Sequence, residues 1–149
     1  MTSKRINVVS IQLVREKSFL FPIREVKSPE ILFKLVKPFL ADQDREHLLL
    51  VCVDTKNQPT SISTISVGSL SSSVVHPREV FKAAILTNAH SIFLAHNHPS
   101  GDPSPSREDV GVTKRIAECG ELLGIPLLDH LIVGDSADRY VSLKDKNLI

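Results

Sequence analysis

Two histidines separated by one residue, His96 and His98, give the clearest indication of chemistry in this sequence of 149 residues. They follow a short apolar run, residues 91–95, that is typical of a buried strand. A loop rich in Pro, Gly and Ser comes next. Because side chains two positions apart on a strand point to the same side, the two imidazoles can converge on one point. Imidazole nitrogens are common zinc ligands, so the pair is a candidate metal site.

A carboxylate follows at Asp109, in the first turn of a helix predicted to begin near Ser106. The positions that share its helix face, at steps of three and four residues, are mostly apolar: Val112, Thr113, Ile116, Gly120 and Leu123. We therefore expect Asp109 to point inward, where a carboxylate needs a cation or several hydrogen bonds. Glu108 lies on a different face and is better placed to reach water. Two imidazoles and one carboxylate, with a fourth position open, are typical of a catalytic zinc site.

The same residues also have a purely structural interpretation. The two histidines could be exposed loop residues, and Asp109 could close a capping box with Ser106, three residues before it. A short motif taken alone favours that interpretation, because such motifs often occur by chance. The strand end, the stiff loop and the inward-facing Asp109 together favour a metal site.

The wider pattern resembles a known group of metallopeptidases. His96-x-His98-Pro99, followed by Ser106-x-x-Asp109, resembles the JAMM signature of the MPN/JAB1 metallopeptidases. Within that group, three stretches resemble the bacterial RadC family: residues 76–81, 94–109 and 123–130. The resemblance extends from about residue 28 to the C-terminus.

The resemblance implies a fold, a cofactor and a reaction. The fold would be α/β, a curved mixed sheet flanked by helices, as in the cytidine-deaminase-like architecture. Zinc bound by His96, His98 and Asp109 would activate a water molecule to cleave a peptide or isopeptide amide bond. Glu46 would act as the general acid and base, and Ser106 would help to stabilise the oxyanion. From the residues alone, Glu46 could also be a solvated side chain at a strand end, and Ser106 could be only a helix N-cap.

The length predicts a single domain over residues 1–149. The chain resembles the short family members, which lack the N-terminal helical domain of the longer ones. Apolar residues make up 42% of the chain, enough for a core at this length. The net charge of +1 gives no overall attraction to nucleic acid or membranes. Cys52 and Cys119 lack metal-site spacing and are predicted to be buried free thiols. With no signal peptide and no apolar run of spanning length, the prediction is a cytoplasmic protein that does not enter membranes.

Strand and helix patterns alternate along the chain, which predicts an α/β or α+β fold with a mixed sheet. The predicted strands are residues 6–14, 46–53, 59–67, 91–95, 127–133 and a short edge strand at 140–143, with residues 19–21 pairing back. The predicted helices run from Ser28 to about Leu40, from His76 to about Ala89, and from Ser106 to Gly124. His47, His90 and His130 have no partner at ligand spacing, and we interpret them as structural or surface residues.

Other functions are weighed against the amide hydrolase. A metal-dependent nuclease or DNA-associated factor is the alternative, suggested by the historical link of the RadC family with DNA repair. No basic stripe with interleaved aromatic residues supports binding to nucleic acid. A nucleoside deaminase requires H-x-E and P-C-x-x-C, which the sequence lacks. A scaffold that has lost its ligands is disfavoured, because every ligand position is filled. The predicted partner is therefore a peptide or protein substrate.

Overall fold

The computed structural model describes residues 1–71, 73–135 and 138–149. The elements in chain order are α1 (Pro29–Leu40), β1 (His47–Val53), β2 (Pro59–Val67), α2 (Pro77–Leu86), β3 (Ser91–Asn97), α3 (Arg107–Leu123), β4 (Leu127–Val133) and β5 (Tyr140–Ser142). Most of them match the predicted elements within a few residues.

The strands form one mixed sheet in the order β2-β1-β3-β4-β5. β3 and β4 are parallel, and the other neighbouring pairs are antiparallel. A parallel pair needs a crossover connection, which α3 supplies between β3 and β4. The predicted α/β class with a mixed sheet and flanking helices is confirmed.

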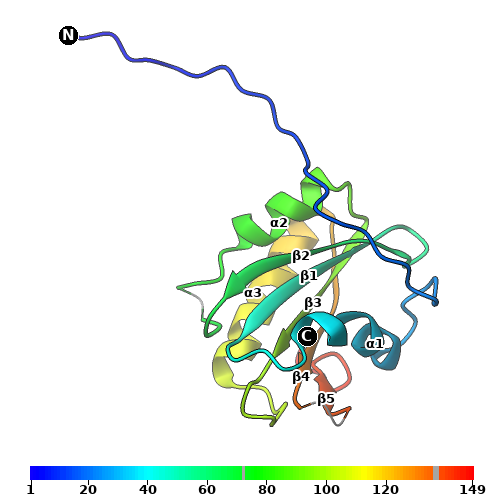
Figure 1. Ribbon diagram of the computed structural model, residues 1–149. Coiled ribbons are helices and arrows are strands. Elements are labelled where there is room, and N and C mark those ends of the chain that lie inside the picture. Colours follow the sequence, from blue (N-terminus) through cyan, green and yellow to red (C-terminus); the bar gives the residue numbers. More distant parts are fainter. Residues whose placement is uncertain (72, 136–137) are drawn as a thin grey trace.

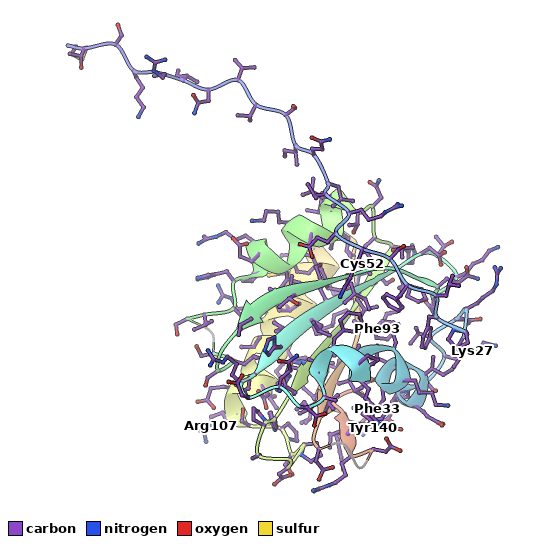
Figure 2. The ribbon with its side chains drawn as sticks, viewed as in Figure 1. Lys27, Phe33, Cys52, Phe93, Arg107 and Tyr140 are labelled. Carbon is purple, nitrogen blue, oxygen red and sulfur yellow. The ribbon has the colours of Figure 1, made fainter. Side chains whose placement is uncertain are left out.

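Helices cover both faces of the sheet (Figure 1). α1 packs on one face, where Leu49 and Val51 of β1 meet Leu35 and Val36 of the helix. On the same side, the rings of Phe33 and Tyr140 stack 4.8 Å apart (Figure 2). α2 and α3 pack on the opposite face, in a second core cluster. β1 and β3 are buried on both faces, which explains their almost continuous apolar sequence.

Local sequence sets the ends of the two helices that matter most for the core. Ser28 caps α1, its hydroxyl oxygen accepting a hydrogen bond from the backbone N–H of Ile31 at 3.3 Å, and Pro29 fills the first position. Pro38 does not end α1 early, because it lies in the last turn and the helix continues to Leu40. α3 ends at Gly124, which adopts the left-handed conformation that glycine favours.

The predicted strand at residues 6–14 is wrong. These residues are exposed and, within the described residues, join no sheet; Val8 is fully exposed. Figure 1 shows the segment running away from the body of the protein. The alternating pattern suits a strand, but a strand also needs a neighbour to complete its backbone hydrogen bonds. Residues 19–21 do not pair back either, and the ring of Phe19 instead contacts that of Phe39.

Two smaller predictions also differ from the structure. α2 ends at Leu86 rather than near Ala89, because Asn88 adopts a left-handed φ of 55° that helices do not continue through. Cys52 is buried as predicted, whereas Cys119 is only partly buried, and both are free thiols. In the described part of the chain, no helix has the length and apolar character needed to cross a membrane.

Candidate metal centre

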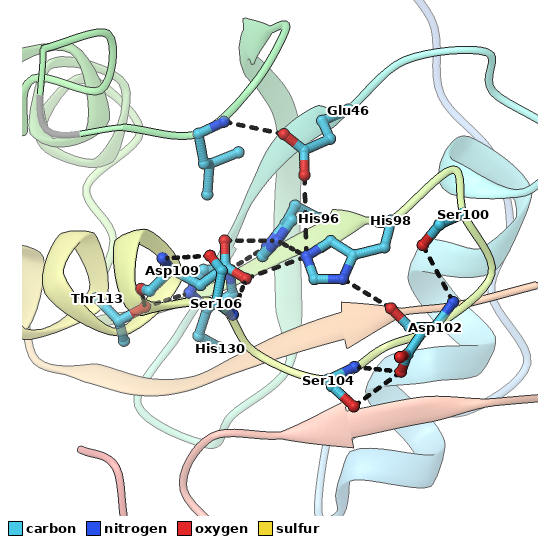
Figure 3. A network of polar contacts seen from close by, with 11 residues as sticks. Glu46, His96, His98, Ser100, Asp102, Ser104, Ser106, Asp109, Thr113 and His130 are labelled. Atoms are coloured by element: carbon cyan, nitrogen blue, oxygen red, sulfur yellow. Dashed lines mark hydrogen bonds and ion pairs between the residues drawn. The ribbon is translucent and has the colours of Figure 1, made fainter.

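His96 and His98 lie together where β3 ends, as their spacing predicts. His96 is a buried β3 residue, and His98 follows the strand, its backbone N–H donating to the carbonyl of Val133 at 2.8 Å. The Nε2 atoms of the two rings are 3.1 Å apart. Figure 3 shows both rings turned toward the N-terminus of α3.

Asp109 points inward from the first turn of α3 and meets both rings. Its side chain is only 2% exposed. Oδ1 lies 3.2 Å from Nε2 of His96, and Oδ2 lies 3.0 Å from Nε2 of His98. The capping box is also present, because Oδ2 accepts from the backbone N–H of Ser106 at 2.8 Å. The structural and the metal-site interpretations of Asp109 are thus compatible.

The predicted buried face of α3 is present except at its end. Val112, Thr113, Ile116 and Gly120 are buried with Asp109, whereas Leu123 is half-exposed. Glu108 is exposed, as expected from its place on another face.

The donor atoms fit a small tetrahedral ion such as zinc. Zinc–ligand bonds near 2.05 Å in tetrahedral geometry place neighbouring ligand atoms about 3.3 Å apart. The two Nε2 atoms are 3.1 Å apart, Nε2 of His96 is 3.2 Å from Oδ1 of Asp109, and Nε2 of His98 is 3.0 Å from Oδ2 of the same carboxylate. A set of two imidazoles and one carboxylate suits zinc better than magnesium or calcium, which prefer oxygen ligands.

The loop after His98 fixes the orientation of its ring. Nδ1 of His98 donates to the backbone carbonyl of Asp102 at 2.8 Å, because a carbonyl oxygen can only accept. In the neutral ring, the lone pair is then on Nε2, which faces the cluster. Gly101 allows the tight turn with a φ of 91°. The Asp102 carboxylate serves the turn, as predicted, accepting from the N–H and the hydroxyl of Ser104.

Glu46 faces the same cluster from the start of β1. Its Oε1 lies 3.8 Å from Nε2 of His98, and its Oε2 accepts from the backbone N–H of Leu70 at 3.0 Å. Glu46, His96 and His98 together form a group whose ligand atoms lie within 4.8 Å of one another and could hold a metal ion. Two carboxylates, Asp109 and Glu46, therefore compete for the role of third ligand.

Asn97, which the sequence analysis did not single out, holds Glu46 in this position. Its side-chain oxygen accepts from the backbone N–H of His47 at 2.7 Å. Its side-chain nitrogen donates to the carbonyl of Arg45 at 3.0 Å. These two backbone groups flank Glu46, so the end of β3 clamps the chain on both sides of the carboxylate. The sequence contained one indication of this role: Asn97 is a polar residue on a strand buried on both faces, and a buried polar side chain needs hydrogen-bond partners.

His130 is buried, as a structural histidine would be, but it also contacts the cluster, which the sequence analysis missed. Its Nε2 lies 2.7 Å from Nδ1 of His96. Its Nδ1 lies 2.6 Å from the hydroxyl oxygen of Thr113, which donates to the carbonyl of Asp109. His130 belongs to β4, the parallel neighbour of β3, so its place beside His96 depends on a pairing that sequence spacing does not reveal.

Burial and contact within the cluster shift three pKa values. Burial alone would raise the pKa of Asp109, but hydrogen bonds with His96 and His98 outweigh it and hold the pKa far below its ordinary value. The hydrogen bond with Asp109 raises the pKa of His98 despite its partial burial. Burial lowers the pKa of His130 well below its ordinary value. Shifted pKa values of this kind are typical of functional sites.

Ser106 and a shallow hollow complete the surroundings. The hydroxyl oxygen of Ser106 accepts from the backbone N–H of Asp109 at 3.0 Å, and its side chain is exposed next to the cluster (Figure 3). Its N-cap role is present in the structure, whereas a role at the oxyanion stays a prediction. The hollow is lined by Asp44, Arg45, Glu46, Gly68, Ser69 and Pro99.

Comparison with known proteins agrees with this geometry. The profile of the RadC-like JAB domain matches residues 26–148. The chain belongs to the RadC-like JAB domain family. A UPF0758 protein of Methanosarcina barkeri is 50% identical over 128 residues, which are 86% of this chain and 55% of the relative. A UPF0758 protein of Desulforamulus reducens is 55% identical over 124 residues, 83% of this chain and 54% of the relative.

The described residues include a group that could hold a metal ion. The chain spans about half the length of the curated relatives that it matches. The match begins at residue 26, where the backbone N–H of Val26 bonds to the carbonyl of Asn57 at 2.9 Å. The family therefore corresponds to the folded body, without the exposed N-terminal segment.

Proposed function

We propose that the protein is a zinc-dependent hydrolase that cleaves a peptide or isopeptide amide bond. The observation that carries this proposal is the convergence of His96, His98 and Asp109: the two Nε2 atoms lie 3.1 Å apart, and each lies within 3.2 Å of one oxygen of the Asp109 carboxylate. These three residues would hold the ion. Zinc would supply a nucleophile at neutral pH, because it lowers the pKa of a water that it binds to about 7.

Glu46 would move the proton in this reaction. Its Oε1 faces His98 at 3.8 Å, a longer separation than those among the three proposed ligands, and its Oε2 is held by Leu70. A carboxylate fixed in this way can accept the proton of an attacking water and pass it to the leaving amine. The hydroxyl of Ser106, whose oxygen already accepts from Asp109, keeps its proton free to donate to the developing oxyanion.

The test is hydrolysis by zinc-loaded protein of peptide libraries and of isopeptide-linked conjugates, with DNA substrates in parallel. Glu46→Gln keeps the shape of the side chain but removes the base, so the rate should fall by roughly 10²–10⁴-fold. The matched control is Glu108→Gln, an exposed carboxylate next to Asp109, which should leave the rate unchanged. DNA cleavage without amide cleavage would replace this proposal with the nuclease alternative.

Ser106 provides a second test with the same assay. Loss of one oxyanion donor lowers kcat by about 10²–10³-fold, whereas loss of an N-cap costs about 1 kcal/mol of stability. Ser106→Ala should therefore bind zinc and fold but turn over slowly. Ser10→Ala, an exposed serine of the N-terminal segment, is the control. Full activity of Ser106→Ala would leave capping as the role of the serine.

A further inference from the structure

Two buried side chains behind the proposed ligands, His130 and Thr113, extend a continuous series of hydrogen bonds from His96. It runs from His96 on β3 to His130 on β4 and then to Thr113 on α3, with separations of 2.7 and 2.6 Å. It ends on the backbone carbonyl of Asp109, 2.6 Å from the hydroxyl of Thr113. All three side chains are fully buried, so water does not supply alternative partners. The chain thus links two of the proposed ligands from behind, as the dashed lines in Figure 3 show.

The carbonyl at the end of the chain sets the direction of every bond. A carbonyl oxygen only accepts, so the single hydroxyl proton of Thr113 points to Asp109. The hydroxyl oxygen, with its proton committed, must then accept from Nδ1–H of His130.

The direction of the hydrogen bond between His130 and His96 follows from the surroundings of His130. Both of its ring nitrogens meet uncharged groups, a hydroxyl and an imidazole, and a buried cation without an anionic partner is strongly disfavoured. The ring is therefore neutral, and with Nδ1 protonated its Nε2 carries a lone pair. That lone pair accepts from Nδ1–H of His96, which leaves Nε2, the nitrogen that faces Asp109, as the atom of His96 able to bind a metal.

We propose that His130 and Thr113 are positioning residues that hold His96 in the tautomer whose Nε2 binds the metal. The consequence is a preorganised ligand pair, because the Asp102 carbonyl imposes the same tautomer on His98. Partners of this kind behind a metal-binding histidine orient its ring and raise its basicity. This inference rests on the proposed metal site, and its experiment separates the two.

Thr113 offers a matched pair of variants for the test. Thr113→Val keeps the volume of the side chain but removes the hydroxyl, and Thr113→Ser keeps the hydroxyl. Zinc affinity, measured by competition with a chromophoric chelator, should fall by roughly 10–100-fold in Thr113→Val, the usual loss on removing such a partner. It should stay near that of the wild type in Thr113→Ser. Equal zinc affinities of the two variants, at equal thermal stability, would overturn the proposal.

The tautomers supply a readout that does not require zinc. Long-range ¹H–¹⁵N correlation spectra of the metal-free protein should show His130 as the Nδ1–H tautomer in the wild type and in Thr113→Ser. In Thr113→Val that preference should be lost. A wild-type His130 in the Nε2–H form would overturn the proposal. If the wild type bound no zinc, the proposed metal site would be wrong. The spectra would still determine the direction of the hydrogen bonds that link His96, His130 and Thr113.

Discussion

At the scale of the residue, the cluster combines two demands in single side chains. Asp109 accepts from the N-cap backbone of its own helix and also meets both histidine rings, so capping and ligand geometry use the same carboxylate. A buried carboxylate with this many partners stays ionised. Asp109 therefore caps the N-terminus of α3 and also presents a negative charge to a cation.

The raised pKa of His98 gives the metal-free fold a pH dependence of known sign. Its folded-state pKa lies above the unfolded value of about 6.5, so the bond to Asp109 stabilises the fold fully below that pH. The stabilisation is lost as the pH rises through the raised pKa. His130 does not contribute in this range, since its lowered pKa leaves it neutral in both states above about pH 7.

We therefore expect the melting temperature of chelator-treated protein to fall as the pH is raised from about 7 to about 8.5. His98→Gln should remove most of this slope. Zinc affinity should change in the opposite direction, because zinc needs the neutral imidazole and protons compete with it. A metal-free melting temperature that is flat or that rises over this range would contradict the assignment of the His98–Asp109 contact.

Asn97 yields a prediction about stability and position. Asn97→Ala removes two hydrogen bonds, one from the N–H of His47 and one to the carbonyl of Arg45, and each such bond contributes about 0.5–1.5 kcal/mol. Urea denaturation should show a loss of at least about 1 kcal/mol. Asn7→Ala, in the exposed N-terminal segment, is the control and should change nothing. An Asn97→Ala variant as stable as the wild type would show that the clamp is unimportant.

At the scale of the element, α3 carries the proposed ligand at one end and a close backbone approach at the other. A Cβ added at Gly120 would lie 2.5 Å from the carbonyl oxygen of Ile125, whereas one added at Gly111 would meet open space. Both glycines lie within the same helix, so local helix propensity alone would make alanine favourable at either position.

The two substitutions to alanine should therefore change the stability of the protein in opposite directions. Gly111→Ala should stabilise the protein by about 0.5–1 kcal/mol, because alanine loses less backbone entropy in a helix. Gly120→Ala should destabilise it, because the backbone at Ile125 must shift to relieve the contact. Thermal denaturation of the two variants side by side is the measurement. Stabilisation by both would mean that the turn after α3 packs less closely than the structure has it.

At the scale of the whole molecule, the folded body and the N-terminal segment differ sharply. Residues 1–18 are exposed, and Ile6 and Val8 contribute nothing to either core cluster. Deleting residues 1–18 should leave the free energy of unfolding within about 0.5 kcal/mol of the full chain, as for changes at exposed positions. Denaturant unfolding of both chains tests this. A loss of several kcal/mol would mean that the segment packs against the fold or against a second copy.

Sequence predicts those parts of this molecule that depend on local pattern. Periodicity and capping signals located β1, β3 and α3, and the H-x-H spacing located the cluster. Each of these signals is contained in a short stretch of sequence, so no knowledge of distant contacts is needed. The strand at residues 6–14 failed because its pattern contains no information about a partner. His130 and Asn97 were missed for the same reason, since their roles depend on contacts between strands that are distant in sequence.

The central claim is that His96, His98 and Asp109 bind the metal while Glu46 does not, and zinc content per chain tests it most directly. Elemental analysis after zinc loading and desalting should give one zinc per chain for the wild type and for Glu46→Gln. It should give little or none for His98→Ala and Asp109→Asn, which each remove a proposed ligand. Full zinc retention by His98→Ala, or loss of zinc in Glu46→Gln with retention in Asp109→Asn, would contradict the account.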